Sequence, residues 1–378
     1  MRLTEADGKA LLRRHGIATP RGVVVAMDEP LPDSLAAFPE LVVKAQLLEG
    51  GRGKRGLVRR ATPAGLAEER QAIAKIAGPV AILVEEAVAI EREIYLALRV
   101  DGTRQAQELL FAAHGGVEIE QAGGTRRIAL QADAPDAAEQ VFVAVRDALP
   151  PALAARVARL AARLGRIARD EDLSLLEINP LAVTRAGLVA CDAKLIRDEV
   201  ASGRHAPELT ATSAALEDAS LSALERRARQ AGFALVEMPG DVALVSAGAG
   251  LGMFLMDLIA DHGLRAACFM DNLHGGPMDT TEARLTAAFE IAARPEVKAI
   301  LFYTTLASRP LSDRIEGLLA FLARQPTPKP IFAGFAAAPS ATRGFDVAAA
   351  TERLRTAGIA QLHEDPLTLV RAMAEAVA

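Results

Sequence analysis

The chain has 378 residues, of which 51% are hydrophobic and 24% are charged. A chain of this length exceeds one ordinary hydrophobic core, so we expect a globular protein of two or three domains. The net charge of −5 indicates no basic surface for nucleic acid. The apolar runs are far shorter than the roughly 18 residues that a membrane-spanning helix needs. Neither nucleic acid nor a membrane is therefore expected as a partner.

The start of the chain and its cysteines bear on the cellular compartment. Residues 1–5 lead directly into an amphipathic helix and lack the basic, apolar and small-residue order of a signal peptide. Cys191 and Cys268 are far apart in the sequence, which indicates neither a disulfide framework nor a CxxC metal pair. We expect a cytoplasmic protein.

The first half of the chain, residues 1–205, has the pattern of a strand-rich α+β domain, and residues 206–240 are interpreted as a linker because they hold two prolines and a polar helix. Short apolar runs bounded by turn residues predict strands, and longer amphipathic stretches predict helices. The helices are expected at 4–15, 63–77 and 151–169, and the strands at 22–26, 41–45, 56–60, 81–87, 93–100 and 107–112, followed by a hairpin near 175–194.

From residue 241 to 378 the pattern changes to regular alternation of strands and helices. This alternation predicts a doubly wound parallel sheet with helices on both faces, in which ligands bind beyond the carboxyl ends of the strands. The strands are expected at 242–246, 266–270, 298–303, 330–334 and 359–362, and the helices at 250–262, 280–293, 311–324, 347–356 and 366–377.

The hairpin near 175–194 carries hard oxygen ligands. Glu177 and Asn179 are two residues apart in a strand and so point to the same face of the sheet, while Pro180 is expected to end regular pairing. Asp192 is expected on the returning strand. A carboxylate, an amide and a second carboxylate form the oxygen set that Mg²⁺ accepts beside a nucleotide's phosphates. The alternative is a polar turn with exposed carboxylates.

A second signature follows the strand that contains Lys44. The next residues form a Gly-rich basic turn, Gly50–Gly56, which includes Gly51, Arg52 and Gly53. A strand lysine can hold phosphate oxygens, and a glycine loop can approach them with its backbone N–H groups. It is not a Walker loop, because the GxxxxGK[ST] order is absent. The alternative is a mobile turn.

Two further carboxylates flank the connection between the strands at 81–87 and 93–100. Glu85 lies near the end of the first strand and Glu93 begins the second. Backbone groups of such a connection can hold an adenine edge, and a carboxylate can hold a ribose hydroxyl. Each residue taken alone is better explained as a solvated strand carboxylate.

These motifs together resemble the β subunit of succinyl-CoA synthetase and the ADP-forming acid–CoA ligases, over nearly the whole chain. The resemblance implies an ATP-grasp domain followed by a flavodoxin-like ligase domain. It also implies that Lys44, Gly51, Arg52, Gly53, Glu85 and Glu93 contact ATP, that Asn179 and Asp192 bind Mg²⁺, and that Glu177 faces a phosphorylated histidine. The motifs that carry it, in order, are Lys44, Gly50–Gly56, Glu85, Glu93–Leu96, Gly115–Glu120, Glu177–Leu181 and Asp192–Lys194.

In similar proteins the phosphorylated histidine and most of the CoA site belong to a separate α subunit. This chain has six histidines, and none lies in a recognisable phosphohistidine motif. The resemblance therefore implies an α-type, CoA-binding partner subunit, in a heterodimer or a heterotetramer.

The second half departs from the family at its substrate motifs. The family's Asn-Gly-Ala-Gly turn reads Ala247-Gly248-Ala249-Gly250 here, and its Gly-Gly-Ile turn reads Leu306-Ala307-Ser308-Arg309. The asparagine amide is thus missing, whereas a helix that opens at Ser308 still offers N–H groups to a phosphate. Gly248, Ser308 and Arg309 are candidate substrate residues, and the expected acid is a small carboxylic acid other than succinate.

The expected enzyme is an ADP-forming acid–thiol ligase that uses ATP, Mg²⁺ and CoA. Three alternatives remain open: succinyl-CoA synthetase itself, an ATP-grasp carboxylate–amine ligase, and a non-catalytic nucleotide-binding subunit. The flavodoxin-like half counts against the second alternative, and the presence of Lys44, Glu93, Asn179 and Asp192 counts against the third.

Overall fold

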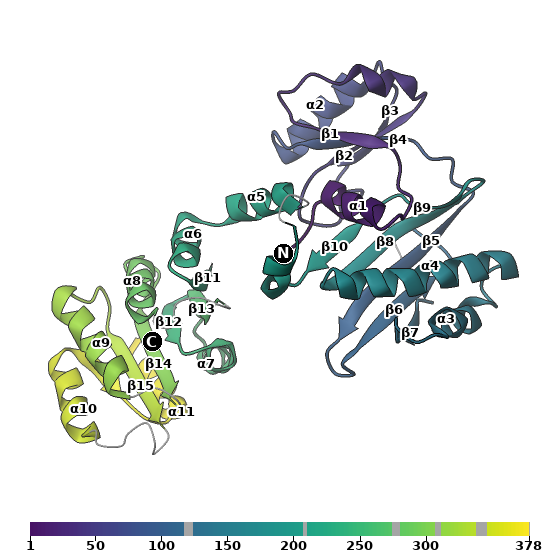
Figure 1. Ribbon diagram of the computed structural model, residues 1–378. Coiled ribbons are helices and arrows are strands. Elements are labelled where there is room, and N and C mark those ends of the chain that lie inside the picture. Colours follow the sequence, from purple (N-terminus) through teal and green to yellow (C-terminus); the bar gives the residue numbers. More distant parts are fainter. Residues whose placement is uncertain (117–123, 207–209, 274–279, 307–310, 338–345, 378) are drawn as a thin grey trace. The chain divides into compact units, whose positions relative to one another are not determined.

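The computed structural model describes residues 1–116, 124–206, 210–273, 280–306, 311–337 and 346–377. The chain forms two compact units, Met1–Ser220 and Leu221–Ala378 (Figure 1). The boundary falls inside the segment 206–240, which was expected as a linker. This segment contains α5 (Ala211–Ser220) in the first unit, and α6 (Ala223–Gln230) and β11 (Phe233–Glu237) in the second.

The first unit contains a small antiparallel sheet that is covered by one helix. Its apolar side chains, among them Leu41, Val43 and Val84, pack against Leu66 and Ile73 of the helix in a core of their own. The strand order is β1 (Gly22–Val25), β4 (Ile82–Glu86), β2 (Leu41–Ala45) and β3 (Val58–Ala61), the helix is α2 (Leu66–Ala77), and a short 3-10 helix, η1 (Asp33–Ala37), precedes β2.

A larger antiparallel sheet forms the rest of the first unit. Its order is β10 (Lys194–Arg197), β8 (Leu173–Thr184), β5 (Arg92–Asp101), β6 (Ala106–Ala112) and β7 (Arg126–Leu130), and β9 (Gly187–Ala190) pairs with β8. The helices α1 (Glu5–Arg14), α3 (Ala137–Val145) and α4 (Pro151–Asp170) share its core, and η2 (Glu199–Arg204) follows β10.

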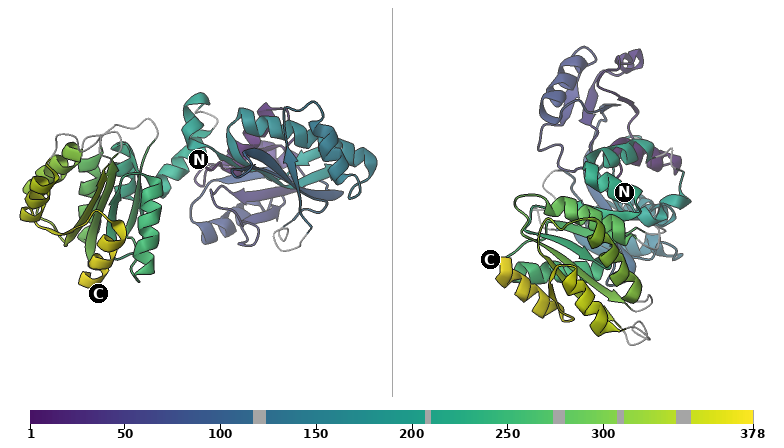
Figure 2. Two further views of the ribbon diagram at one scale, coloured as in Figure 1. Left: turned by 90° about the horizontal axis from the view of Figure 1, so that it is seen from below. Right: turned by 90° about the vertical axis from the view of Figure 1, so that its left-hand side faces the viewer.

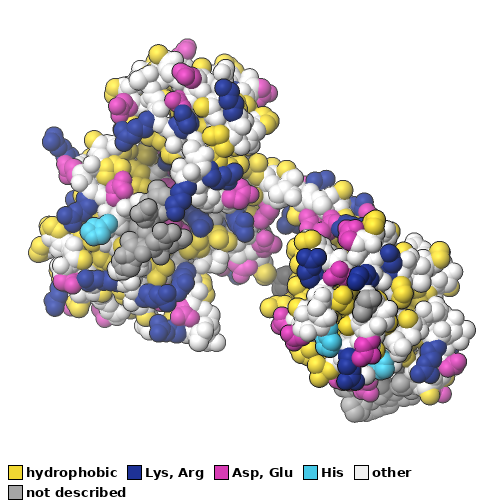
Figure 3. Space-filling view, turned by 180° about the vertical axis from the view of Figure 1, so that it is seen from behind, with side chains coloured by type: hydrophobic (Ala, Val, Ile, Leu, Met, Phe, Trp, Pro, Cys, Tyr) yellow, Lys and Arg dark blue, Asp and Glu magenta, His cyan; other side chains and the backbone are white. Residues whose placement is uncertain are grey.

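Helix α4 shows how the sequence fixes this packing. Apolar side chains recur every three or four residues and are buried, as at Val157, Ala161 and Leu164, whereas the intervening arginines, such as Arg159 and Arg163, are exposed. Figure 3 shows basic and acidic side chains interspersed over one face of the molecule. Among the described residues, no helix is long and apolar enough to cross a membrane.

The second unit is a doubly wound parallel sheet, as expected from the sequence. The strands β12 (Val242–Ser246), β14 (Ala299–Leu306), β15 (Ile331–Ala337) and β16 (Ile359–Leu362) are parallel neighbours, while β13 (Cys268–Asn272) pairs antiparallel with β11. Figure 2 shows helices on both faces of the sheet, and their buried side chains belong to two separate cores. One core includes α7 (Ala249–Asp261) and α11 (Pro366–Val377), and the other includes α8 (Thr281–Ala292), α9 (Leu311–Arg324) and α10 (Val347–Thr356).

Candidate functional site: a buried charge cluster in the first unit

Lys44 lies near the end of β2 and is almost completely buried, with 7% of its surface exposed. Its Nζ lies 2.6 Å from Glu5 Oε1 and 3.0 Å from Glu85 Oε2. It also donates a hydrogen bond of 2.6 Å to the Cys191 carbonyl. Burial lowers the pKa of Lys44, but the two carboxylates outweigh this effect and raise the pKa above the usual value of lysine.

Two members of this cluster, Glu5 and Lys9, were missed by the sequence analysis. Both belong to α1, whose first turn is capped by the Thr4 hydroxyl, and both are buried. Lys9 Nζ lies 2.7 Å from Glu5 Oε1 and 2.7 Å from Glu85 Oε2. A signal was present in the sequence, because Glu5 and Lys9 fall on the same helical face as the apolar Leu12.

Arg52 connects the Gly-rich turn to the cluster. Its Nη2 lies 2.7 Å from Glu5 Oε2 and 3.0 Å from Asp192 Oδ1, and its Nη1 donates to the Ala45 carbonyl at 3.1 Å. Gly51 has a φ of +72°, which favours glycine. A side chain at Gly51 would meet open space, so conformation and not crowding requires glycine there. The structure therefore brings Lys44 and Arg52 of the predicted phosphate clamp together.

Asp192 lies between β9 and β10 and not on the returning strand, so that part of the sequence expectation is wrong. The chain leaves β9 at Ala190, and Lys194 is the residue that pairs with Glu177 across β10 and β8. The Asp192 side chain keeps 37% of its surface exposed. Burial and the nearby Glu5 carboxylate raise its pKa, against the effect of Arg52 and Lys44.

Glu177 and Asn179 alternate with the buried Leu176 and Ile178 along β8, which places both on one face as expected. Pro180 does not end the strand. β8 continues to Thr184 through a register shift, at which Leu96 pairs with Ile178 and Ile94 pairs with Leu181. This bulge accommodates the proline within the sheet.

The hairpin side chains engage different partners. Asn179 Oδ1 accepts a hydrogen bond from the Gly116 N–H at 2.8 Å, and its Nδ2 donates to the Gly116 carbonyl at 3.1 Å. Glu177 Oε2 lies 3.8 Å from Lys194 Nζ. In the part of the chain that the structure describes, no group of three or more His, Cys, Asp or Glu side chains is arranged as a metal site.

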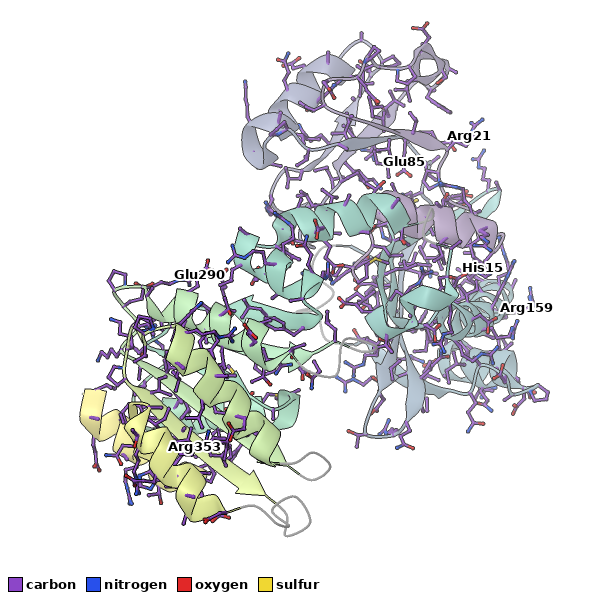
Figure 4. All side chains as sticks on the ribbon, turned by 60° about the vertical axis from the view of Figure 1, so that its left-hand side comes forward. His15, Arg21, Glu85, Arg159, Glu290 and Arg353 are labelled. Atoms are coloured by element: carbon purple, nitrogen blue, oxygen red, sulfur yellow. The ribbon has the colours of Figure 1, made fainter. Side chains whose placement is uncertain are left out.

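The connection between β4 and β5 borders a hollow of about 530 Å³. It is lined by residues 87–93 together with Glu40 and Arg60, so Glu93 lines it. Glu85, which is labelled in Figure 4, instead directs its carboxylate to Lys9 and Lys44. A hollow of this size lies within the usual range of small-molecule sites.

The predicted substrate turn of the second unit begins α7. Gly248 precedes this helix with a φ of +104°, a conformation that glycine adopts readily. Arg284, which the sequence analysis missed, donates to the Ser246 carbonyl at 2.9 Å and to Asn272 Oδ1 at 2.6 Å, and so joins the ends of β12 and β13. Ser308, Arg309 and residues 117–120 of the resemblance lie outside the described residues.

Comparison with known proteins identifies the family. An ATP-grasp domain matches residues 2–183. The β subunit of ADP-forming succinate–CoA ligase from Ignicoccus hospitalis is 33% identical over 354 residues, which cover 88% of this chain and 90% of that protein. The chain belongs to this family of ADP-forming acid–CoA ligase β subunits. The resemblance, the fold class and the enzyme class expected from the sequence are thereby confirmed, and ATP use is implied.

Other relatives show the breadth of the family. The ADP-forming sulfoacetate–CoA ligase subunit SauC from Bilophila wadsworthia is 33% identical over 347 residues, covering 86% of this chain and 88% of that protein. The structure of ATP citrate lyase from Methanothrix soehngenii superposes with a TM-score of 0.70 at 19% identity, covering 99% of this chain and 98% of that chain. This last likeness concerns the fold alone.

Proposed function

We propose that this chain is the ATP-binding β subunit of an ADP-forming acid–CoA ligase. The reaction converts an acid, ATP and CoA into an acyl-CoA, ADP and phosphate through a phosphohistidine on a partner α subunit. The observation that carries the proposal is the cluster in which Lys44 and Arg52 are held beside Asp192 by Glu5 and Glu85. Phosphoryl transfer depends mainly on such positioning and on charge neutralisation.

The residues divide the work of binding ATP. The hollow at residues 87–93 receives the adenine and ribose, with Glu93 at its edge. Lys44 and Arg52 hold phosphate oxygens, and the backbone N–H groups of Gly51 and Gly53 close over them. Glu85 contributes by holding Lys44.

The donor atoms of Asn179 and Asp192 fit Mg²⁺, which prefers oxygen ligands. Asp192 is partly exposed, and Asn179 Oδ1 accepts a hydrogen bond from the Gly116 N–H and has a second lone pair. When bound, the ion neutralises phosphate charge. Asp192, whose pKa is raised by burial and by Glu5, is a carboxylate that gains from a nearby cation.

The phosphorylated histidine comes from an α-type partner subunit, which also supplies most of the CoA site. His15 and His205 of this chain are paired with carboxylates: His15 Nε2 lies 2.7 Å from Glu171 Oε1, and His205 Nε2 lies 2.8 Å from Asp172 Oδ2. Glu177 faces the partner's imidazole. The names of the relatives as β subunits support a partner, and free cysteines suit the reducing cytoplasm in which we place the enzyme.

The acid is a small carboxylic acid other than succinate. Ala247 provides no amide at the turn where the resemblance implies an asparagine, while Gly248 still opens α7. Ser308 and Arg309 are the other candidate substrate residues. A sulfoacetate–CoA ligase subunit among the relatives shows that the family accepts different acids.

An activity screen tests this proposal. The chain, co-expressed with its α subunit, is supplied with Mg-ATP and a panel of dicarboxylates, hydroxy acids and sulfonated acids, and ADP release is measured with and without CoA. We expect CoA-dependent release with an acid other than succinate. Preference for succinate would support succinyl-CoA synthetase, the second candidate favoured by the relatives' names. ADP release that does not depend on CoA would contradict both candidates.

A further inference from the structure

The cluster around Lys44 is balanced in charge. Its three cations and three carboxylates come from α1, β2, the Gly-rich turn, β4 and the connection after β9, so the charges of the six side chains sum to zero. Burial is deepest around the two α1 residues, whose side chains are each 1% exposed. The six residues are Glu5, Lys9, Lys44, Arg52, Glu85 and Asp192.

Lys44 donates hydrogen bonds to Glu5 and to the Cys191 carbonyl and forms an ion pair with Glu85 inside this cluster. An ammonium group has three N–H donors, and three acceptors lie within 3.0 Å of its Nζ: Glu5 Oε1, Glu85 Oε2 and the Cys191 carbonyl. A phosphate oxygen that binds Lys44 therefore competes with these three contacts. A buried carboxylate that lost its only cation would pay a large desolvation cost.

Lys9 contacts the same three groups as Lys44. Its Nζ lies 2.7 Å from Glu5 Oε1, 2.7 Å from Glu85 Oε2 and 2.8 Å from the Cys191 carbonyl. Both carboxylates thus keep a cation when Lys44 turns to another anion. Because the Lys9 side chain is almost completely buried, it does not itself meet a ligand from solvent.

We propose that Lys9 is a positioning residue that neutralises Glu5 and Glu85 and so releases Lys44 to bind nucleotide phosphate. This inference rests on the proposed function, because it assigns a role toward ATP. It gives α1, which contributes no group to the predicted phosphate clamp, a part in setting the affinity of that clamp.

Charge balance predicts opposite effects for the two α1 residues. Lys9→Met leaves the cluster with one excess negative charge, so Lys44 is held by the carboxylates and Mg-ATP affinity falls by about tenfold or more. Glu5→Gln leaves one excess positive charge, and its Mg-ATP affinity is several-fold stronger than that of the wild type. The double variant restores neutrality and binds within about threefold of the wild type. If Lys9 and Glu5 had only a packing role, both single variants would bind Mg-ATP more weakly than the wild type, and the double variant would show the sum of the two losses.

The experiment is calorimetric titration of the full chain with Mg-ATP, with thermal unfolding of each variant measured in parallel. Lys75→Met, which removes an exposed lysine of α2, is the control for loss of one positive charge. Opposite effects of the single variants and recovery in the double variant are expected. Unchanged affinity in folded Lys9→Met, or a double variant as weak as Lys9→Met, would overturn the proposal.

Two further outcomes are separated by the same titrations. If Lys9→Met does not fold, the double variant must bind several-fold more weakly than Glu5→Gln, and equal affinities overturn the role of Lys9. If the wild-type chain does not bind Mg-ATP, the proposed function fails and the role of Lys9 fails with it. If the wild type binds Mg-ATP and Lys9→Met binds it equally well, only the role of Lys9 is overturned.

Discussion

Replacing Lys44 with methionine tests the phosphate clamp most sharply. The substitution keeps the length of the side chain and removes a buried ammonium that contacts Glu5 and Glu85. A charge-assisted hydrogen bond contributes about 2 kcal/mol, which corresponds to a roughly thirtyfold weaker Kd for Mg-ATP. Folding stability also falls, by less than the roughly 3–5 kcal/mol of breaking an isolated buried pair, because Lys9 still pairs with both carboxylates.

The assay is calorimetry with Mg-ATP on the wild type, Lys44→Met and the control Lys75→Met, each at a temperature at which thermal unfolding shows it to be folded. The control is expected to bind like the wild type. Equal Mg-ATP affinity in the wild type and in folded Lys44→Met would refute the claim that Lys44 binds ATP phosphate. The Gly50–Gly56 turn would then have no role in nucleotide binding.

Three other predictions follow from the same site. Asp192→Asn removes a charged ligand and should raise the Mg²⁺ concentration needed for ADP formation; an unchanged Mg²⁺ dependence would argue against this ligand. Burial raises the pKa of Glu5, but the neighbouring cations Lys44, Lys9 and Arg52 outweigh this effect and hold the pKa of Glu5 below the ordinary 4.5. The ionised Glu5 carboxylate therefore stabilises the fold above about pH 4.5, and this stabilisation is lost on acidification. The melting temperature of the wild type should fall more steeply than that of Glu5→Gln between about pH 5 and about pH 3, and parallel curves would exclude this account. Glu177→Gln should slow phosphorylation of the partner's histidine and leave Mg-ATP affinity nearly unchanged, as single-turnover labelling and calorimetry would show.

The fold of the second unit was predictable because the spacing of apolar residues differs clearly between its strands and its helices. The strand Val242–Ser246 and the helix Leu311–Arg324 have the bounds expected from the sequence. In the first unit, β7 (Arg126–Leu130) and α3 (Ala137–Val145) were not predicted. β7 has only five residues, two arginines followed by three apolar residues, and so shows no alternation, while α3 has nine residues and no side-chain cap. Each therefore gives a weak local signal.

The sequence singled out Lys44 and Arg52 because a strand lysine followed by a Gly-rich basic turn forms a local pattern, and both contact Glu5 in the structure. The contacts that hold them were not predictable, because Glu5 meets Lys44 across 39 positions and Arg52 meets Asp192 across 140. Local patterns do not encode such pairings. A charged residue on the apolar face of a helix, as at Lys9, is the one local sign that a buried partner exists.

The central claim, that this chain supplies ATP-binding residues and its partner supplies the phosphorylated histidine, is tested directly by γ-labelled ATP. The purified chain is incubated with label and Mg²⁺, alone and with an α-type subunit that carries a loop histidine, and acid-labile protein-bound phosphate is measured in each subunit. The account predicts label on the α subunit only, and none on this chain when it is alone. Acid-labile label retained by this chain in isolation would contradict the two-subunit mechanism.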